Sequence, residues 1–196
     1  REVYVDRVEP LALGVDVARF GMNSSVIFPR KGRDARTIER FRYNGYSTTQ
    51  LASEVVSINN QYHADGIMID GGGVGGGVVD QVRAGRLFCY EVQFGGKDVI
   101  HNTIWGNTGE KYANNRAAMY GACRAWLETG ALPPDPDLKR QMMAIRYTFN
   151  AKDEIILERK EDLVDEDGQG ISLDDIDALV LTFSHPLSRS AYAGGD

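Results

Sequence analysis

Cysteine is scarce in this sequence, and it has neither a long apolar run nor a secretion signal. The two cysteines, Cys89 and Cys123, lie in unrelated segments and form no CxxC pair. Nothing therefore supports a disulfide framework or a thiolate zinc site, and we expect two buried, reduced thiols. No stretch approaches the roughly 20 apolar residues that span a bilayer. The opening residues, REVYVDRVEP, are charged and lack the apolar core of a signal peptide.

The length and composition are typical of one globular domain. The chain has 196 residues, of which 42% are hydrophobic and 26% are charged, enough for a single full hydrophobic core. We treat residues 1–196 as one domain and expect an unstructured tail from about residue 186. Because the sequence has no initiator methionine and enters a predicted strand almost at once, we also expect it to be part of a longer chain.

The acidic charge is concentrated in one segment. The formal net charge is −6, which by itself argues against a nucleic-acid partner. Residues 153–177 contain eleven acidic and two basic residues, which leaves 17 acidic and 20 basic residues elsewhere. Such a cluster is either a solvated loop or part of a cation site, because clustered carboxylates need protons or metal ions to relieve their repulsion. The net charge does not decide between these interpretations.

Hydrophobic periodicity and turn residues predict a single α/β domain. Three strands separated by glycine- and proline-containing turns come first, and helices and strands then alternate. This order predicts a mixed sheet flanked by helices. The expected strands are residues 11–17, 24–30, 36–43, 66–70 and 87–93, with a hairpin over 146–150 and 154–160, and the expected helices are residues 48–62, 78–85, 112–129, 138–145 and 172–184.

Aspartates occur in three otherwise apolar segments. Asp16 lies inside the first expected strand, Asp70 ends the fourth, and Asp174 and Asp177 share one face of the last expected helix. Carboxylates in such settings are costly to bury unless they are paired, hydrogen-bonded or bound to a cation. If the two strands are neighbours, Asp16 and Asp70 point into one crevice.

These four aspartates predict a divalent-metal site. Hard oxygen ligands without nearby histidine or cysteine suit Mg²⁺ or Mn²⁺, and two such ions about 4 Å apart would activate a water and stabilise the leaving oxygen of a phosphodiester. Each aspartate alone has an ordinary interpretation: Asp16 could end a strand, Asp70 could lead into a turn, and Asp174 could favour a helix N-terminus. As a set in this order, they favour a metal-dependent nuclease.

The glycine run 71–77, GGGVGGG, lies between an expected strand and an expected helix. That position is typical of phosphate-binding loops, but no Lys-Ser/Thr follows the run, so it is not a P-loop. Glu91 lies at the distance expected for a ribose-binding acid in a dinucleotide site. A backbone beside Asp70 that approaches a phosphate, or packs closely on a helix, is the favoured interpretation.

Several basic residues are candidates for contacts with a nucleic-acid backbone. Each of them is also explained as a solvated surface residue. The candidates are Lys97, Lys111, Arg116, Lys139, Arg140 and Lys160, and those we predict to bind DNA are Lys97, Lys111, Arg116 and Lys160.

Four segments in this order resemble the C-terminal nuclease domain of the large terminase subunit of tailed bacteriophages and prophages. They are LGVDVARFGMNSSVI (13–27), IMIDGGGVGGGVVDQV (67–82), NNRAAMYGACRAWLETGALPPD (114–135) and ISLDDIDALVLTF (171–183). The resemblance implies an RNase H-like fold, with a five-stranded mixed sheet of three antiparallel and then two parallel strands, and helices on both faces. It also implies that Asp16, Asp70 and one or both of Asp174 and Asp177 bind the catalytic Mg²⁺ or Mn²⁺ ions.

The resemblance extends to substrate, partners and location. It implies cleavage of double-stranded concatemeric viral DNA during packaging, in the cytoplasm of the infected bacterial host. It implies contacts with the ATPase domain of the same full-length chain, with the portal protein and with the small terminase subunit, and none with a membrane. The last motif departs from many relatives, because Leu173 stands where they have proline and Asp175 adds an acid. Which of the three neighbouring aspartates binds metal is therefore open, with Asp177 first and Asp174 second.

Three other functions remain alternatives. The first alternative keeps the same fold but makes the domain a Holliday-junction resolvase or a nuclease that cuts RNA–DNA hybrids. The glycine run leaves open a nucleotide-binding module. The third alternative is a domain that has no catalytic activity and serves only as a docking surface for packaging partners.

Overall fold

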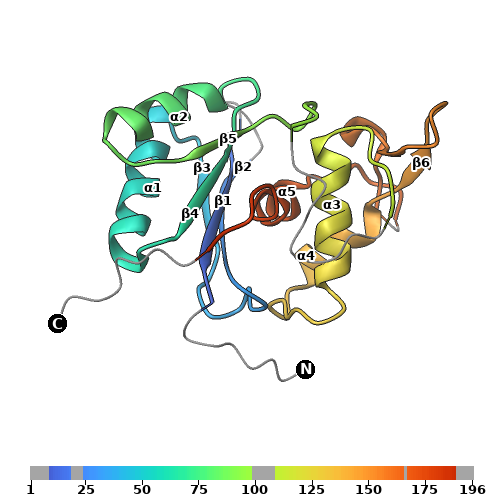
Figure 1. Ribbon diagram of the computed structural model, residues 1–196, viewed down its shortest axis with the longest axis horizontal. Helices are drawn as coiled ribbons and strands as arrows, with labels where there is room; N and C mark the ends of the chain where they lie inside the picture. Colours follow the sequence, from blue (N-terminus) through green and yellow to red (C-terminus); the bar gives the residue numbers. More distant parts are fainter. Residues whose placement is uncertain (1–8, 19–23, 99–108, 166, 189–196) are drawn as a thin grey trace.

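The computed structural model describes residues 9–18, 24–98, 109–165 and 167–188. Its main sheet has the strand order β3–β2–β1–β4–β5 (Figure 1). The β1–β2 and β2–β3 pairs are antiparallel, whereas the β1–β4 and β4–β5 pairs are parallel, which confirms the predicted mixed sheet. The strands are β1 (Leu11–Asp16), β2 (Ser24–Lys31), β3 (Phe41–Asn44), β4 (Gly66–Asp70) and β5 (Tyr90–Val92).

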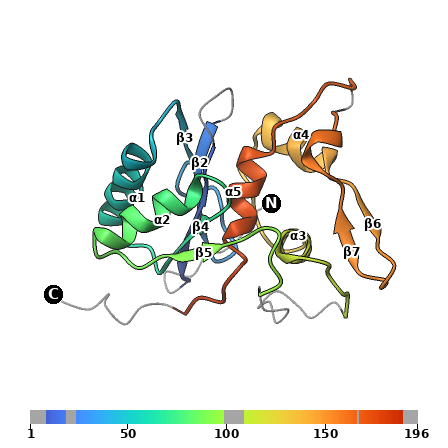
Figure 2. The same ribbon diagram turned by 90° about the horizontal axis from the view of Figure 1, so that it is seen from above.

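Helices lie on both sides of this sheet (Figure 2). The helices are α1 (Thr48–Tyr62), α2 (Gly75–Ala84), α3 (Asn115–Trp126), α4 (Pro136–Ala144) and α5 (Asp174–Leu181). Alternate residues of β1 separate two cores. Leu13 and Val15 join the core shared with α1 and α2, whereas Ala12 joins the core shared with α3 and α5. A small hairpin of β6 (Tyr147–Phe149) and β7 (Ile155–Leu157) follows α4, and the single-turn helix η1 (Lys160–Asp162) comes next.

Side chains that cap the helices set their ends. The Ser47 hydroxyl accepts a hydrogen bond from the Gln50 backbone N–H, and the Gln50 side-chain oxygen accepts one from the Ser47 backbone N–H, so α1 begins with a capping box. The Asn114 side chain accepts from Ala117 N–H at 2.9 Å. This cap makes α3 start at Asn115 rather than at the predicted Tyr112.

Two predicted strands are shorter than expected. The third strand begins at Phe41 and not at Arg36, because the Asp34 carboxylate accepts hydrogen bonds from the Arg36 backbone and side chain and holds a turn there. The fifth strand begins at Tyr90 and not at Leu87. Arg86 lies in the turn after α2 and adopts a left-handed conformation with φ of 63°. Strand residues do not adopt this conformation, so the strand begins only after the turn.

The helix α5 is fastened to the middle of the sheet. The Arg30 guanidinium donates to the Thr182 hydroxyl and carbonyl, each at 2.7 Å, and stacks over Phe183. At Gly14 the sheet and the helix touch: a Cβ there would lie 1.9 Å from the Ala178 carbonyl oxygen. The close packing of α5 on β1 fixes the position of the helix's acidic first turn.

Other sequence expectations can be placed on this fold. Cys89 and Cys123 are buried and unbridged, as predicted. Within the described residues no helix is both long enough and apolar enough to cross a membrane. Leu187, which lies in the predicted unstructured tail, packs against the core, while residues 189–196 lie outside the described residues.

Candidate metal centre

Asp16 and Asp70 end two adjacent parallel strands. The register pairs Val15 of β1 with Ile69 of β4, so the next residue on each strand is an aspartate. The carboxyl ends of parallel strands meet at one edge of a sheet, where ligand sites commonly form. Asp16 is 6% exposed, and Asp70 is half-buried. The two strands are therefore neighbours, as expected, and both carboxylates stand at the same edge of the sheet.

The glycine run that follows β4 packs around Asp70. The Gly72 backbone N–H donates to Asp70 Oδ1 at 3.0 Å. A Cβ on Gly75 would lie 1.8 Å from the Asp70 carbonyl oxygen, so only glycine lets α2 begin this close to the strand. Gly73 supplies the left-handed turn between them, with φ of 58°. These contacts make the run a support of Asp70, a role that the sequence did not predict.

Asp177 is the fully buried acid of α5, with an exposed fraction of 0%. Its Oδ1 accepts a hydrogen bond from the Tyr120 hydroxyl of α3 at 2.8 Å. Its Oδ2 forms an ion pair with the Lys160 ammonium of η1 but has no aligned hydrogen-bond partner. A buried carboxylate oxygen in this state favours a further cation.

Asp174 and Asp175 have different surroundings. Asp174 is half-buried and accepts hydrogen bonds from the Ser24 backbone at 3.2 Å and from the Ser172 hydroxyl at 2.6 Å. Asp175 is 1% exposed and turns towards β3 and α4. Its carboxylate forms ion pairs with Arg40 and Arg42 and accepts a hydrogen bond from Gln141.

The partners of Asp175 make it a clamp rather than a ligand. Arg42 Nε donates to Asp175 Oδ1 at 2.8 Å, and Gln141 Nε2 donates to Oδ2 at 2.7 Å. The Gln141 side-chain carbonyl in turn accepts from the backbone N–H groups of Asp175 and Ile176. Both oxygens of Asp175 are thus used within the protein, and the network ties the start of α5 to β3 and α4.

The electrostatics show that the remaining acids share one site. Burial raises the pKa of Asp16 well above its usual value, and the nearby charge of Asp177 raises it further, followed by those of Asp174 and Asp70. Burial also raises the pKa of Asp70. Like charges held close in a desolvated place disfavour ionisation. Asp70, Asp174 and Asp177 therefore all lie within electrostatic reach of Asp16.

Lys160 supplies the positive charge in this cluster. Burial lowers the pKa of its ammonium, but the carboxylates of Asp177 and Asp16 more than compensate, so its net pKa is raised. The side chain as a whole is 45% exposed, because its stem runs along the surface and only its end turns inward to Asp177. The Lys160 ammonium thus lies at Asp177 Oδ2, where a metal cation bound by the carboxylates would also lie.

The donor set fits a hard divalent cation, although it is not drawn together around one. In the described ranges no three His, Cys, Asp or Glu side chains already stand in the geometry of a metal site. Asp177 Oδ2 pairs with the Lys160 ammonium, but the neighbouring carboxylates still raise the pKa of Asp16, so acidic charge in the cluster is only partly offset. Carboxylate oxygens alone suit Mg²⁺ and Mn²⁺ better than softer metals.

The predicted basic residues divide into two groups. Arg116 and Lys160 adjoin the acids: the Arg116 guanidinium lies over the Tyr120 ring at 5.5 Å, and its charge opposes protonation of Lys160. Lys97 and Lys111 are exposed and lie near Glu154, at the start of β7. No recorded contact brings this second pair to the carboxylates.

Two features of the site were not predicted from the sequence. Tyr120 was not singled out, since an aromatic residue in an amphipathic helix is usually core. The inward turn of the Lys160 head was also missed, because a lysine in an acidic surface segment gives no sign of its direction. The pairing of a tyrosine with a buried aspartate 57 positions away depends on tertiary packing alone.

Solved structures with the same fold are nuclease domains of phage large terminase subunits. The nuclease domain of the large terminase subunit gp2 of bacterial virus Sf6 matches with a TM-score of 0.70 and 17% identity, over 90% of this chain and 89% of that one. The large terminase nuclease from thermophilic phage G20c, with bound cobalt, matches with a TM-score of 0.62 and 15% identity, over 93% and 84%. No family model matches the sequence, and no curated protein sequence does.

The chain therefore has the RNase H-like fold of the terminase nuclease domains. The resemblance predicted from the sequence motifs is confirmed in the arrangement of the sheet and in the coverage of nearly the whole domain. Related structures of the Sf6 domain hold manganese, and one of the G20c nuclease holds magnesium.

Proposed function

We propose that this domain is a divalent-metal-dependent endonuclease that cuts double-stranded phage DNA during genome packaging. The observation that carries the proposal is the meeting of Asp16, Asp70 and Asp177, from three separate elements, in one desolvated cluster whose acidic charge Lys160 only partly offsets. Burial of like charges has a stability cost that a structural role does not explain, whereas a metal-dependent active site requires it.

In this proposal Asp16, Asp70 and Asp177 hold Mg²⁺ or Mn²⁺, with Asp174 as the fourth ligand and two ions in all. Bound divalent ions would supply a nucleophilic water at neutral pH and stabilise the oxygen that leaves the phosphodiester. The protein's own residues pre-arrange the ligands. Gly72 orients the Asp70 carboxylate, and Tyr120 orients that of Asp177.

Lys160 has a distinct part in this proposal. Its ammonium pairs with Asp177 and reduces the repulsion within the metal-free cluster. Because a divalent cation and the ammonium compete for the same carboxylate oxygens, cation binding displaces the lysine head. The 45% exposed side chain has room to swing outward, where it can meet a DNA phosphate.

Double-stranded DNA is the proposed substrate because the solved structures of this fold are terminase nucleases. We propose Arg116 and Lys160 as contacts beside the cleaved bond, and Lys97 and Lys111 as contacts farther along the duplex. The ATPase domain of the same full-length chain, the portal protein and the small terminase subunit are the proposed partners. Weak binding of DNA by the isolated domain agrees with its net charge of −6.

A plasmid-cleavage assay tests the proposal. With Mn²⁺ or Mg²⁺ the domain should nick and linearise supercoiled plasmid, and EDTA should abolish this activity. Asp16→Asn and Asp70→Asn should each reduce the rate by at least about 100-fold, because each removes a ligand charge. Asp80→Asn, on an exposed position of α2, is the matched control and should cleave like the unmodified domain.

Two results would contradict the proposal. One is cleavage by Asp16→Asn at the unmodified rate. The other is a clear preference for four-way junctions or RNA–DNA hybrids over linear duplex when the substrates compete in one reaction. The second result would assign the same site to a resolvase or a hybrid nuclease.

A further inference from the structure

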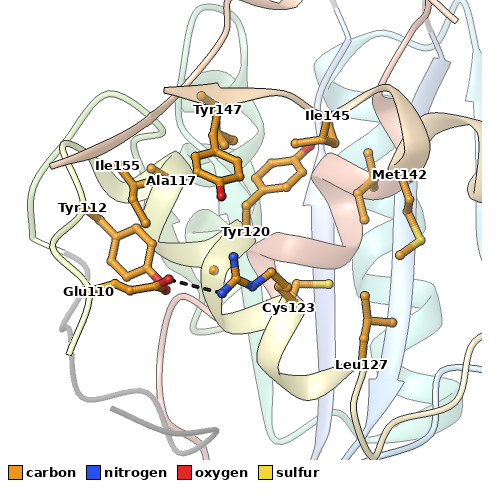
Figure 3. Close-up of a pocket in the computed structure, with 14 residues that line it drawn as sticks. Glu110, Tyr112, Ala117, Tyr120, Cys123, Leu127, Met142, Ile145, Tyr147 and Ile155 are labelled. Atoms are coloured by element: carbon orange, nitrogen blue, oxygen red, sulfur yellow. Dashed lines mark hydrogen bonds and ion pairs between the residues drawn. The ribbon is translucent and has the colours of Figure 1, made fainter. Parts of the chain in front are cut away.

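A cavity of about 250 Å³ lies between α3, the end of α4 and the β6–β7 hairpin (Figure 3). Its walls are mainly apolar and include Ala117, Met142 and Leu157. The space opens to solvent on one side, where Arg124 and Tyr147 of its wall are exposed. An apolar cavity of roughly 150 Å³ is sufficient to bind benzene in another protein.

The cavity shares a wall with the acidic cluster. The Tyr120 ring lines the cavity, while its hydroxyl donates to Asp177 at 2.8 Å. Ile176, the residue before Asp177 in α5, lines it as well. The wall of the cavity therefore includes both the group that orients Asp177 and the neighbour of Asp177 in the chain.

The lining defines the chemistry of an occupant. The Cys123 thiol is neutral, since burial raises its pKa to about 12, and Met142 contributes a thioether. Sulfur groups of this kind pack well against aromatic rings. The polar edge consists of the Glu110 carboxylate, which is held by the Tyr112 hydroxyl at 2.6 Å and by Arg124 at 3.1 Å (Figure 3). Both oxygens of this carboxylate thus have partners within the protein, and its negative charge disfavours an anionic occupant.

We propose that this cavity binds an uncharged aromatic molecule of one or two rings, and that its occupancy strengthens divalent-cation binding at Asp177. The second half of the proposal rests on the proposed metal site. A ligand that fills the space beside Tyr120 prevents the ring from moving into it and so keeps the hydroxyl on Asp177 Oδ1, with Oδ2 left for the cation. By thermodynamic linkage, the cation strengthens ligand binding by the same factor.

Indole is a suitable probe, because it is uncharged and has two aromatic rings. Titration of indole in EDTA, followed by calorimetry, should give saturable binding of one molecule per domain. Saturating indole should then lower the Kd for Mn²⁺ roughly fivefold, the lower end of ordinary allosteric coupling. Tyr120→Phe should still bind indole but lose the coupling, because it keeps the ring and removes the hydroxyl that reaches Asp177.

A filled cavity provides the second comparison. Ile145→Trp places a larger side chain at the cavity wall and should abolish indole binding while Mn²⁺ binding persists. Met143→Trp is the matched control. It introduces the same tryptophan two residues away, at a 55% exposed position outside the cavity, and should behave like the unmodified domain. If Ile145→Trp does not fold, indole-induced NMR shifts of the Met142 and Ala117 methyl groups should identify the binding place instead.

The outcomes separate the two halves of the proposal. Absence of saturable binding up to roughly 10 mM indole, or binding that survives in folded Ile145→Trp, would overturn the cavity as a ligand site. An unchanged Kd for Mn²⁺ in the presence of bound indole would overturn the coupling. A domain that binds no Mn²⁺ at all would refute the proposed function and the coupling. The titration of indole in EDTA would still test whether the cavity binds a ligand.

Discussion

Three acids in the first turn of α5, Asp174, Asp175 and Asp177, show how position within one turn decides the role of a side chain. Asp174 faces β2 at the rim of the cluster, Asp175 faces the arginines of β3, and Asp177 faces Tyr120 and Lys160. The sequence left open which of them binds metal. The contacts favour Asp177 as the first ligand and assign Asp175 to holding the helix.

The clamp predicts a difference between two neighbouring substitutions. Asp175→Asn should lower the free energy of unfolding by about 3 kcal/mol, because it removes the charge of a buried carboxylate that Arg40 and Arg42 share and leaves Arg40 with Asp135 as its remaining partner. Asp174→Asn, at the half-buried neighbour, should change it by no more than about 1 kcal/mol. Urea denaturation of both variants measures the difference, and equal effects would contradict the clamp.

The cost of burying Asp16 predicts a stabilising substitution. Its pKa is raised by burial and by Asp177, so the ionised carboxylate at pH 7 is less favourable in the folded state than in the unfolded chain. Asp16→Asn removes that charge and should raise the melting temperature of the metal-free domain, even though it abolishes cleavage. A melting temperature equal to or below that of the unmodified domain in EDTA would show that the folded state does not disfavour this charge.

Lys160 predicts a substitution that improves metal binding. Lys160→Ala removes the ammonium that competes for Asp177 Oδ2, so the Kd for Mn²⁺ should fall roughly fivefold or more. The metal-free variant should be less stable, since repulsion among the carboxylates is no longer offset. Lys152→Ala, in the exposed turn between β6 and β7, is the control. Weaker Mn²⁺ binding by Lys160→Ala would instead make the lysine a supporting group of the metal site.

At the scale of elements, the site depends on where α5 crosses the sheet. The Gly14 and Ala178 backbones lie in close contact. The helix would clash with β1 if it moved inward and would lose this contact if it moved outward. That contact places the acidic first turn of α5 beside the carboxyl ends of β1 and β4. Glycine at position 14 is thus required by packing.

A methyl group at this position should disturb both stability and activity. Gly14→Ala places a Cβ 1.9 Å from a backbone oxygen, and we expect a loss of about 3 kcal/mol in unfolding free energy, together with reduced cleavage. Gly95→Ala meets nothing within 4 Å and should be close to neutral. Chemical denaturation compares the two, and a neutral Gly14→Ala would show that α5 has freedom to shift.

The main elements were predictable because their signals are local. Apolar runs marked the strands of the sheet, and the order of motifs gave its arrangement. The ends of elements were less predictable: the side chains of Asp34 and Asn114 moved the starts of β3 and α3 by several residues. Aspartates in apolar segments identified the candidate ligands, because the cost of burying charge is visible in sequence. The partners of those aspartates were not visible, because Tyr120, Lys160 and Arg40 meet them only after folding.

At the scale of the whole molecule, the metal-free domain is held together around a repulsive centre. The sheet, the two cores and the Asp175 clamp offset the cost of the clustered carboxylates. A bound cation should therefore stabilise the fold: at a free Mn²⁺ concentration 100 times its Kd, the free energy of unfolding should rise by about 2.7 kcal/mol and fall back on addition of EDTA. Thermal unfolding at several Mn²⁺ concentrations measures this dependence. A melting temperature that does not change with Mn²⁺ would contradict it.

Direct titration of Mn²⁺ into the domain tests the central claim, that Asp16, Asp70 and Asp177 form a metal centre. Calorimetry should show saturable binding to the unmodified domain and to Asp80→Asn. Binding to Asp177→Asn should be at least about tenfold weaker, because that variant loses the buried carboxylate on which the cluster converges. Equal Kd values for Asp177→Asn and the unmodified domain would contradict the account.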